Sequence, residues 1–135
     1  MANYLIIGAS SGIGKKLSEQ LSKSGHQVFG TYCQNEMHSD NPLIQFHQLN
    51  VLAENILYDF VPETLNGVVY CPGSINLRSF ERIKPADFIS DYSLQVVGAI
   101  KVIQAVARKL KNSDNAAIIL FSTVAVKWVC HFIHK

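Results

Sequence analysis

The stretch that decides the fold is Tyr4-Leu5-Ile6-Ile7-Gly8-Ala9-Ser10-Ser11-Gly12-Ile13-Gly14, near the amino end of the chain. Its first four residues form a continuous apolar run, which is typical of a strand buried on both faces. The pattern then changes, because Ile13, Leu17 and Leu21 recur every four residues among polar neighbours. This spacing predicts an amphipathic helix that Ser24-Gly25 ends.

The alternation of strand and helix continues along the chain. We predict further strands over 28–32, 43–51, 67–71 and 116–121, with a short helix over 53–60 and a long helix over 85–110. The long helix begins at Pro85, a favoured first-turn residue. Its apolar stripe comprises Phe88, Ile89, Tyr92, Val96, Ile100, Ile103 and Val106. Strands that alternate with helices predict the α/β class, with a parallel sheet and right-handed crossovers.

Composition indicates one globular domain. The chain has 135 residues, of which 48% are hydrophobic and 16% charged, so a buried core is expected. A net charge of +2 is too small to indicate a nucleic-acid or membrane-surface protein. No apolar run approaches the roughly 20 residues of a membrane span, and no basic segment precedes the first apolar residues. Cys33, Cys71 and Cys130 are odd in number and share no Cys-x-x-Cys spacing, so we expect a reducing, cytoplasmic location.

The turn at residues 8–14 has the chemistry of an anion site. Glycines let the backbone turn tightly and approach a ligand without a Cβ in the way. The helix that follows offers unpaired N–H groups and a partial positive charge, and Ser10 and Ser11 add hydroxyl groups. The alternative is a glycine-rich turn that only changes the direction of the chain. Its position between a strand and a helix favours a dinucleotide phosphate site.

The spacing Gly-x-x-x-Gly-x-Gly, written here as Gly-Ala-Ser-Ser-Gly-Ile-Gly, resembles the short-chain dehydrogenase/reductase family. The resemblance runs from Asn3 to about Val126. It implies a Rossmann-type, doubly wound parallel sheet in three αβα layers that is incomplete at the carboxyl end. It divides the chain into an NAD(P)-binding domain over 1–126 and an atypical tail over 127–135.

Two further segments carry the resemblance and imply a nicotinamide cofactor. Asn50-Val51 stands where the family has an Asp-Val pair that contacts adenine, and Cys71-Pro72-Gly73 replaces the Asn-Ala-Gly that closes over the cofactor. Adenine is then expected near Asn50 and the pyrophosphate at residues 12–14. The implied cofactor-binding residues are Gly8, Ser10, Ser11, Gly12, Ile13, Gly14, Asn50, Val51, Cys71, Pro72 and Gly73.

The choice between NAD and NADP depends on the end of the second strand. A carboxylate there would bind the ribose hydroxyls of NAD, and Tyr32-Cys33-Gln34-Asn35 supplies none. Lys15 is the nearest cation for the extra phosphate of NADP, although it also fits as a solvated lysine on the helix surface. The sequence therefore leans to NADP.

The family's chemistry uses a Ser, a Tyr and a Lys, often with an Asn. Thr123 stands at the serine position with Ser122 before it, and Gln95 replaces the asparagine. The two hydroxyls also fit as a polar pair at a strand end that only water satisfies. None of the five tyrosines has a lysine four residues on, and the chain ends at Lys135 without a Tyr-x-x-x-Lys pair.

Three functions remain open at this point. The first is an NAD(P)-dependent carbonyl or alcohol oxidoreductase, with 3-oxoacyl thioesters or small ketones as substrates implied by the resemblance. The second is an inactive nucleotide-binding fragment of a frameshifted or truncated reductase. The third is an intact small protein that uses the fold to bind a partner.

The last nine residues, Lys127 to Lys135, look foreign to the family. Cys130, His131 and His134 form too compact a cluster to predict a metal site. Reading the back-translated tail one base earlier permits Gln-Met-Gly-Leu-Pro-Phe-His-Ser-Gln, whose Gly-x-Pro resembles the segment after the family's serine. We therefore expect a frameshift near Val126. The strand over 116–121 would then lie at an open sheet edge, which predicts association into a homo-oligomer.

Overall fold

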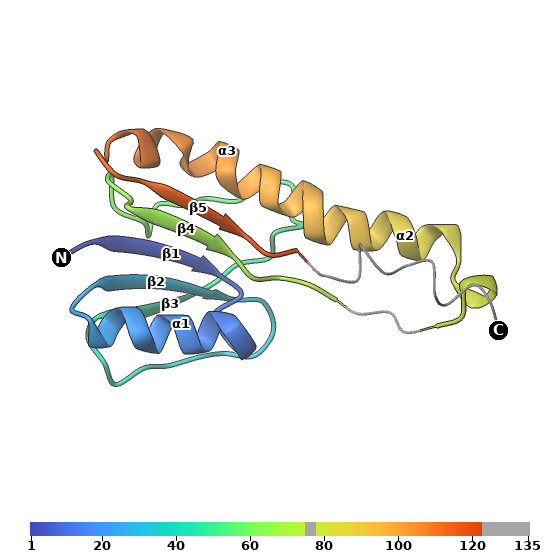
Figure 1. Ribbon diagram of the computed structural model, residues 1–135, viewed down its shortest axis with the longest axis horizontal. Coiled ribbons are helices and arrows are strands. Elements are labelled where there is room, and N and C mark those ends of the chain that lie inside the picture. The colour runs from blue at the N-terminus through green and yellow to red at the C-terminus, as the bar shows by residue number, and fades with distance from the viewer. Residues whose placement is uncertain (75–77, 123–135) are drawn as a thin grey trace.

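The computed structural model describes residues 1–74 and 78–122 (Figure 1). Within these ranges no helix is both long and apolar enough to cross a membrane. The elements, in chain order, are β1 (Asn3–Ile7), α1 (Gly12–Lys23), β2 (Gln27–Tyr32), β3 (Ile44–Gln48), β4 (Gly67–Tyr70), η1 (Phe80–Arg82), α2 (Pro85–Tyr92), η2 (Ser93–Val97), α3 (Gly98–Lys111) and β5 (Ala117–Leu120).

The five strands of the described residues form one parallel sheet in the order β3-β2-β1-β4-β5. The chain runs outward from β1 through β2 to β3, then returns to the other side of β1 for β4 and β5. Ile7 and Tyr70 are register partners, so the carboxyl ends of β1 and β4 lie side by side. In such doubly wound sheets the ligand crevice lies at this reversal point. The predicted fold class is confirmed.

The two faces of the sheet are covered by different helices. Leu5 and Ile7 point to the face where Val102 and Val106 of α3 complete a buried cluster. Ile6 points to the opposite face, where Leu17 and Leu21 of α1 pack. Because side chains alternate along a strand, β1 contributes to both layers of core. The result is the expected three-layer αβα arrangement.

Helix α1 forms as predicted, but its buried side differs from the expected stripe. Leu17 and Leu21 pack on the sheet, whereas Ile13 is 59% exposed. The fully buried positions are Gly14, Ser18 and Ser22. A small residue is needed at Gly14 because a Cβ there would lie under 3.0 Å from the Gly8 carbonyl oxygen, and the Ser18 hydroxyl donates to the Gly14 carbonyl at 2.8 Å.

The helix predicted over 53–60 is wrong, because this segment consists of turns and bends. The Asn50 side-chain oxygen accepts from the Leu52 N–H at 3.0 Å, a local turn that competes with helix formation. Lysines of α3 then bind backbone carbonyls at the start of the segment and just after it: the Lys101 ammonium donates to the Ala53 carbonyl, and the Lys109 ammonium donates to the Val61 carbonyl. Tertiary contacts thus replace helical hydrogen bonds.

The long helix is continuous from Pro85 to Lys111, but Ser93–Val97 adopts a π-helical turn. Its predicted stripe is largely exposed. Of the seven residues, only Val106 is fully buried, and the helix buries Ala99, Val102 and Leu110 beside it. The physical reason is visible in Figure 1, where α2 continues beyond the strand ends and only α3 lies over the sheet.

A candidate dinucleotide-binding crevice

The turn between β1 and α1 contains three glycines that are needed for two reasons. Gly8 and Gly12 adopt φ angles of +78° and +53°, which residues with a side chain rarely adopt. Gly14 has an ordinary φ, but a Cβ there would lie under 3.0 Å from the Gly8 carbonyl oxygen. These glycines therefore let the turn fold against the start of α1 without backbone strain or steric overlap.

Thr31 of β2 holds this turn in place. Its hydroxyl accepts a hydrogen bond from the Gly8 N–H at 3.2 Å, and its carbonyl accepts one from the Ala9 N–H at 2.8 Å. Thr31 is only 1% exposed, so it supports the turn from beneath. Sequence reasoning missed this residue, because a threonine within a strand carries no local signal.

The first turn of α1 has backbone amides without a helical acceptor. The helical bonding begins with the Lys15 N–H, which donates to the Ser11 carbonyl at 3.2 Å. The amides of residues 12–14 therefore have no acceptor within the helix. The Ser11 hydroxyl does not cap the helix, and the first turn contains no acidic residue. This arrangement suits an anion, since the positive end of the helix is not neutralised by its own side chains.

The loop after β4 lies beside the glycine turn at the carboxyl ends of the strands. The Cys71 N–H donates to the Ile7 carbonyl at 2.9 Å, which continues the sheet ladder past Tyr70. Pro72 then lies against Gly8, where an added Cβ would be 3.2 Å from the proline nitrogen. A Cβ on Gly73 would meet no atom within 4 Å. Burial raises the pKa of the Cys71 thiol, so it stays protonated at neutral pH.

Asn50 and Val51 follow β3 at the same end of the sheet, but only one of them is accessible. Asn50 is exposed, and its side-chain oxygen already accepts from the Leu52 N–H. The sequence predicts that this oxygen accepts a hydrogen bond from adenine, and its second lone pair is still available for one. Val51 is 5% exposed and packs in the core beneath α3. Its side chain belongs to the core cluster that α3 completes.

Of the residues predicted to be catalytic, the structure describes Gln95 and Ser122. Gln95 lies in η2, and its side-chain amide donates to the Ser74 carbonyl at 3.3 Å, which joins the long helix to the loop after β4. Ser122 is exposed just after β5. Thr123 lies outside the described residues, as do Cys130, His131 and His134.

Two buried tyrosines, Tyr58 and Tyr70, lie near this end of the sheet. Burial raises the pKa of Tyr70 to about 12. Burial, together with the charge of Tyr70, raises the pKa of Tyr58 to about 12. Both hydroxyls therefore keep their protons at neutral pH.

The loop after β2 has a carboxylate just beyond the segment singled out in the sequence. The Gln48 side-chain amide donates to the Cys33 carbonyl at 3.1 Å and ties β3 to this loop. Glu36, the residue directly after Asn35, lies 3.2 Å from the His38 ring nitrogen, and both side chains are well exposed. Lys15 is exposed on α1.

A doubly wound parallel sheet with a glycine turn at its reversal point is a Rossmann-type α/β fold. A model of the short chain dehydrogenase family matches residues 2–131, which is nearly the whole chain. The chain therefore belongs to the short-chain dehydrogenase family. A search of curated proteins found no match.

Solved structures share the fold at low sequence identity. A short-chain dehydrogenase family protein from Francisella tularensis is 22% identical with a TM-score of 0.73, covering 91% of this chain and 51% of that one. A carbonyl reductase from Pseudomonas aeruginosa is 16% identical, with a TM-score of 0.78 and coverages of 94% and 66%. A short-chain dehydrogenase/reductase from Burkholderia multivorans with bound NADP is 14% identical, with a TM-score of 0.70 and coverages of 90% and 58%. The chain thus spans about half to two thirds of these proteins.

Proposed function

We propose that this chain binds a nicotinamide dinucleotide at the glycine turn, as the cofactor-binding part of a carbonyl or alcohol oxidoreductase. The observation that carries the proposal is the set of free amides at residues 12–14, at the positive end of α1 and without a neighbouring carboxylate. Family membership supports it, and one similar structure holds NADP.

The dinucleotide is proposed to lie across the reversal point of the sheet. Its diphosphate contacts the amides of residues 12–14 and the hydroxyls of Ser10 and Ser11, and its adenine lies near Asn50. The nicotinamide half then lies toward the loop 71–73 and the ends of β4 and β5. Val51 supports this site from the core and makes no direct side-chain contact.

The chemistry proposed for the site uses hydroxyl groups to hold a substrate carbonyl. When bound, the dinucleotide supplies or accepts the hydride. Ser122 or Thr123 donates a hydrogen bond to the substrate oxygen, and Gln95 lines the same region. The substrate class is a small ketone or a 3-oxoacyl thioester.

A second candidate function is nucleotide binding without catalysis. Its support is that none of the five tyrosines of the given sequence has a lysine four residues on. General acid–base assistance contributes about 10²–10⁴-fold to such reactions. Turnover of a ketone panel with NADPH separates the two candidates: reduction favours the oxidoreductase, and binding without turnover favours the second.

The binding site is tested by calorimetric titration of NADPH and NADH into the wild type, Gly12→Ala and Gly25→Ala. Both glycines have a positive φ, and a Cβ at either would meet nothing within 4 Å. Both substitutions therefore strain the backbone by a similar amount, about 1–2 kcal/mol. Only Gly12 lies where the diphosphate is proposed, so Gly12→Ala should weaken binding about tenfold. Equal affinities for the two variants would contradict the proposed site.

The preference for NADP is tested at Lys15. Lys15→Gln should weaken NADPH binding about threefold and leave NADH unchanged, because an exposed cation contributes modestly to binding the extra phosphate. Lys16→Gln removes the same charge one position along the exposed surface of α1 and serves as the control. A loss that is equal for both cofactors would exclude Lys15 as the selecting residue.

We also propose a cytoplasmic location. It is supported by Cys33 and Cys71, which are free thiols in the described part of the chain. Fractionation of cells that express the full chain tests it, and recovery outside the cytoplasmic fraction would contradict it.

A further inference from the structure

The π-helical turn in the long helix occurs where Tyr70 of β4 contacts it. In a regular α-helix the Gly98 N–H would donate to the Leu94 carbonyl, four residues back. Here it donates to Ser93, five residues back. The Leu94 carbonyl accepts instead from the Tyr70 hydroxyl, at 2.5 Å. The Tyr70 hydroxyl therefore donates to the same carbonyl that would accept from the Gly98 N–H in a regular α-helix.

Gly98 makes this contact sterically possible. A Cβ at Gly98 would lie under 3.0 Å from the Tyr70 oxygen and 3.2 Å from a methyl group of Val51. Tyr70 is 5% exposed, so its ring has little room to move aside. Tyr70, Leu94 and Gly98 thus form one unit that links β4 to the helix.

The turn held by this unit carries Gln95 toward the crevice. The Gln95 amide donates to the Ser74 carbonyl, and the Ser74 hydroxyl donates to Asp91 at 2.8 Å. A π-turn contains one extra residue, so the helix before it is rotated by about 100° relative to an α-helical continuation. The register therefore decides which side chains face the loop after β4.

We propose that Tyr70 is a positioning residue: its hydrogen bond to the Leu94 carbonyl holds the π-turn and so directs Gln95 at the crevice loop. This inference rests on the proposed function, because Gln95 then borders the nicotinamide half of the bound dinucleotide. Sequence reasoning gave Tyr70 no role, since its partner lies 24 residues away.

The variant that tests the inference is Tyr70→Phe, which keeps the ring and removes the donor. We expect the Gly98 N–H to return to the Leu94 carbonyl, which changes the amide chemical shifts of Gly98 and Ala99 and the side-chain amide signal of Gln95. NADPH should bind about fivefold more weakly, as for one lost hydrogen bond. Adenosine diphosphate, which lacks the nicotinamide half, should bind as to the wild type.

Tyr58→Phe is the matched control. Tyr58 is 6% exposed, and its hydroxyl has no partner among the described residues. Its removal should change neither the register nor the binding of either ligand. A Tyr70→Phe variant that keeps the wild-type signals at Gly98, or that binds NADPH as tightly as the wild type does, would overturn the inference.

A second pair of variants tests the steric part without any ligand. Gly98→Ala should destabilise the wild type strongly, and it should cost less in the Tyr70→Phe background because the hydroxyl is gone. Additive effects would contradict the proposed unit. If the wild type binds neither NADPH nor adenosine diphosphate, the proposed function fails, while the Gly98 and Gln95 signals still decide whether Tyr70 sets the register.

Discussion

The turn between β1 and α1 depends on glycine at the level of single atoms. Gly14 has no conformational need for glycine, yet a Cβ there would meet the Gly8 carbonyl and the Ala9 backbone. Backbone atoms cannot move aside as a flexible side chain would. Gly73 is the opposite case, because a Cβ on it would project into open space.

This contrast gives a prediction for folding stability. Gly14→Ala should lower the free energy of unfolding by about 2–3 kcal/mol, through overpacking against fixed backbone. Gly73→Ala should change it by less than about 0.5 kcal/mol. Urea denaturation followed by circular dichroism measures both, and a Gly14→Ala variant as stable as the wild type would show that α1 can shift away from the turn.

Tyr58 and Tyr70 give a prediction for pH dependence. Burial raises their pKa from 10.0 to about 12, so the unfolded chain loses these protons at lower pH than the folded chain does. Their stabilising effect is complete below pH 10 and is lost as the pH rises toward 12. Absorbance at the tyrosinate band should show two late-titrating tyrosines in the wild type and one in Tyr70→Phe. Identical titrations for the two proteins would contradict this assignment.

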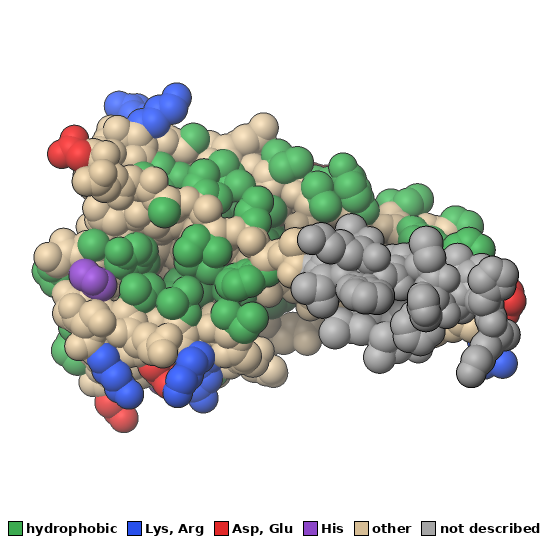
Figure 2. Space-filling model, viewed as in Figure 1, with side chains coloured by type: hydrophobic (Ala, Val, Ile, Leu, Met, Phe, Trp, Pro, Cys, Tyr) green, Lys and Arg blue, Asp and Glu red, His purple; other side chains and the backbone are tan. Residues whose placement is uncertain are grey.

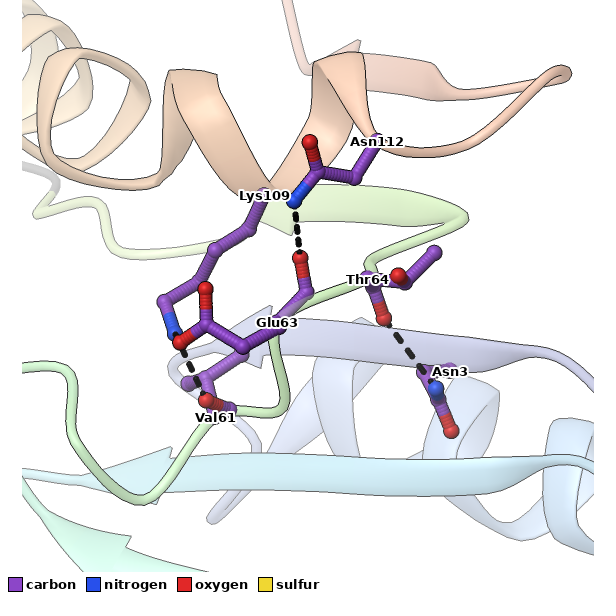
Figure 3. A network of polar contacts seen from close by, with 6 residues as sticks. All are labelled: Asn3, Val61, Glu63, Thr64, Lys109 and Asn112. Atoms are coloured by element: carbon purple, nitrogen blue, oxygen red, sulfur yellow. Dashed lines mark hydrogen bonds and ion pairs between the residues drawn. The ribbon is translucent and has the colours of Figure 1, made fainter.

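Among the elements, the segment between β3 and β4 is stabilised by α3. Figure 3 shows the Lys109 ammonium at the Val61 carbonyl, 2.9 Å away, and the Asn112 side-chain amide at the Glu63 carbonyl, 2.8 Å away. Asn3 of β1 donates to the Thr64 carbonyl at 3.1 Å. These donors satisfy backbone groups that would be paired internally in a helix.

Lys109 also forms an ion pair with Glu63 at 3.1 Å, and the two contacts should differ in strength. The Glu63 side chain is 81% exposed, whereas that of Lys109 is 16% exposed. Lys109→Met should lower the free energy of unfolding by about 1–3 kcal/mol, because the Val61 carbonyl loses its donor. Glu63→Gln keeps that bond and should cost under about 1 kcal/mol. Equal losses in thermal or urea unfolding would assign the stabilisation to the ion pair.

At the scale of the whole molecule, the described residues leave much apolar surface uncovered. In these residues β5 pairs with β4 on one side only, and Ile118, Ile119, Leu120 and Phe121 are all about half exposed. Figure 2 shows hydrophobic side chains over the strands between α1 and α3. The solved relatives are longer, and this chain covers 51–66% of the proteins from Francisella, Pseudomonas and Burkholderia.

An open strand edge with apolar faces favours pairing with another chain. We therefore predict that the isolated chain associates, and that Ile119→Lys, which places a charge on the edge strand, reduces the association. Phe80→Lys is the control, because Phe80 is also exposed but lies in η1, away from β5. Light scattering over a concentration series measures the effect. A monodisperse wild-type monomer with a cooperative melt would contradict the prediction.

The candidate site could be predicted from the sequence only where its signal is local. The glycine turn shows in the spacing of residues 8–14. Pro72 lies against Gly8 because the ends of β1 and β4 are neighbours in a doubly wound sheet. The roles of Thr31 and Tyr70 could not be found, because each acts on a segment more than 20 residues away. Ordinary strand residues give no sign of such contacts.

The sequence by itself determined the five strands, the helix after the first strand, the long helix and the turn that begins α1, because hydrophobic periods and glycine conformations are properties of neighbouring residues. Only the tertiary structure decided that residues 53–60 form no helix, that most of the stripe on the long helix is exposed, and that this helix contains a π-turn. The physical reason is the same in each case. Lys101, Lys109 and the Tyr70 hydroxyl bind these segments from distant parts of the chain, and these contacts outweigh local propensity. The sheet, in turn, is long enough to cover only part of the long helix.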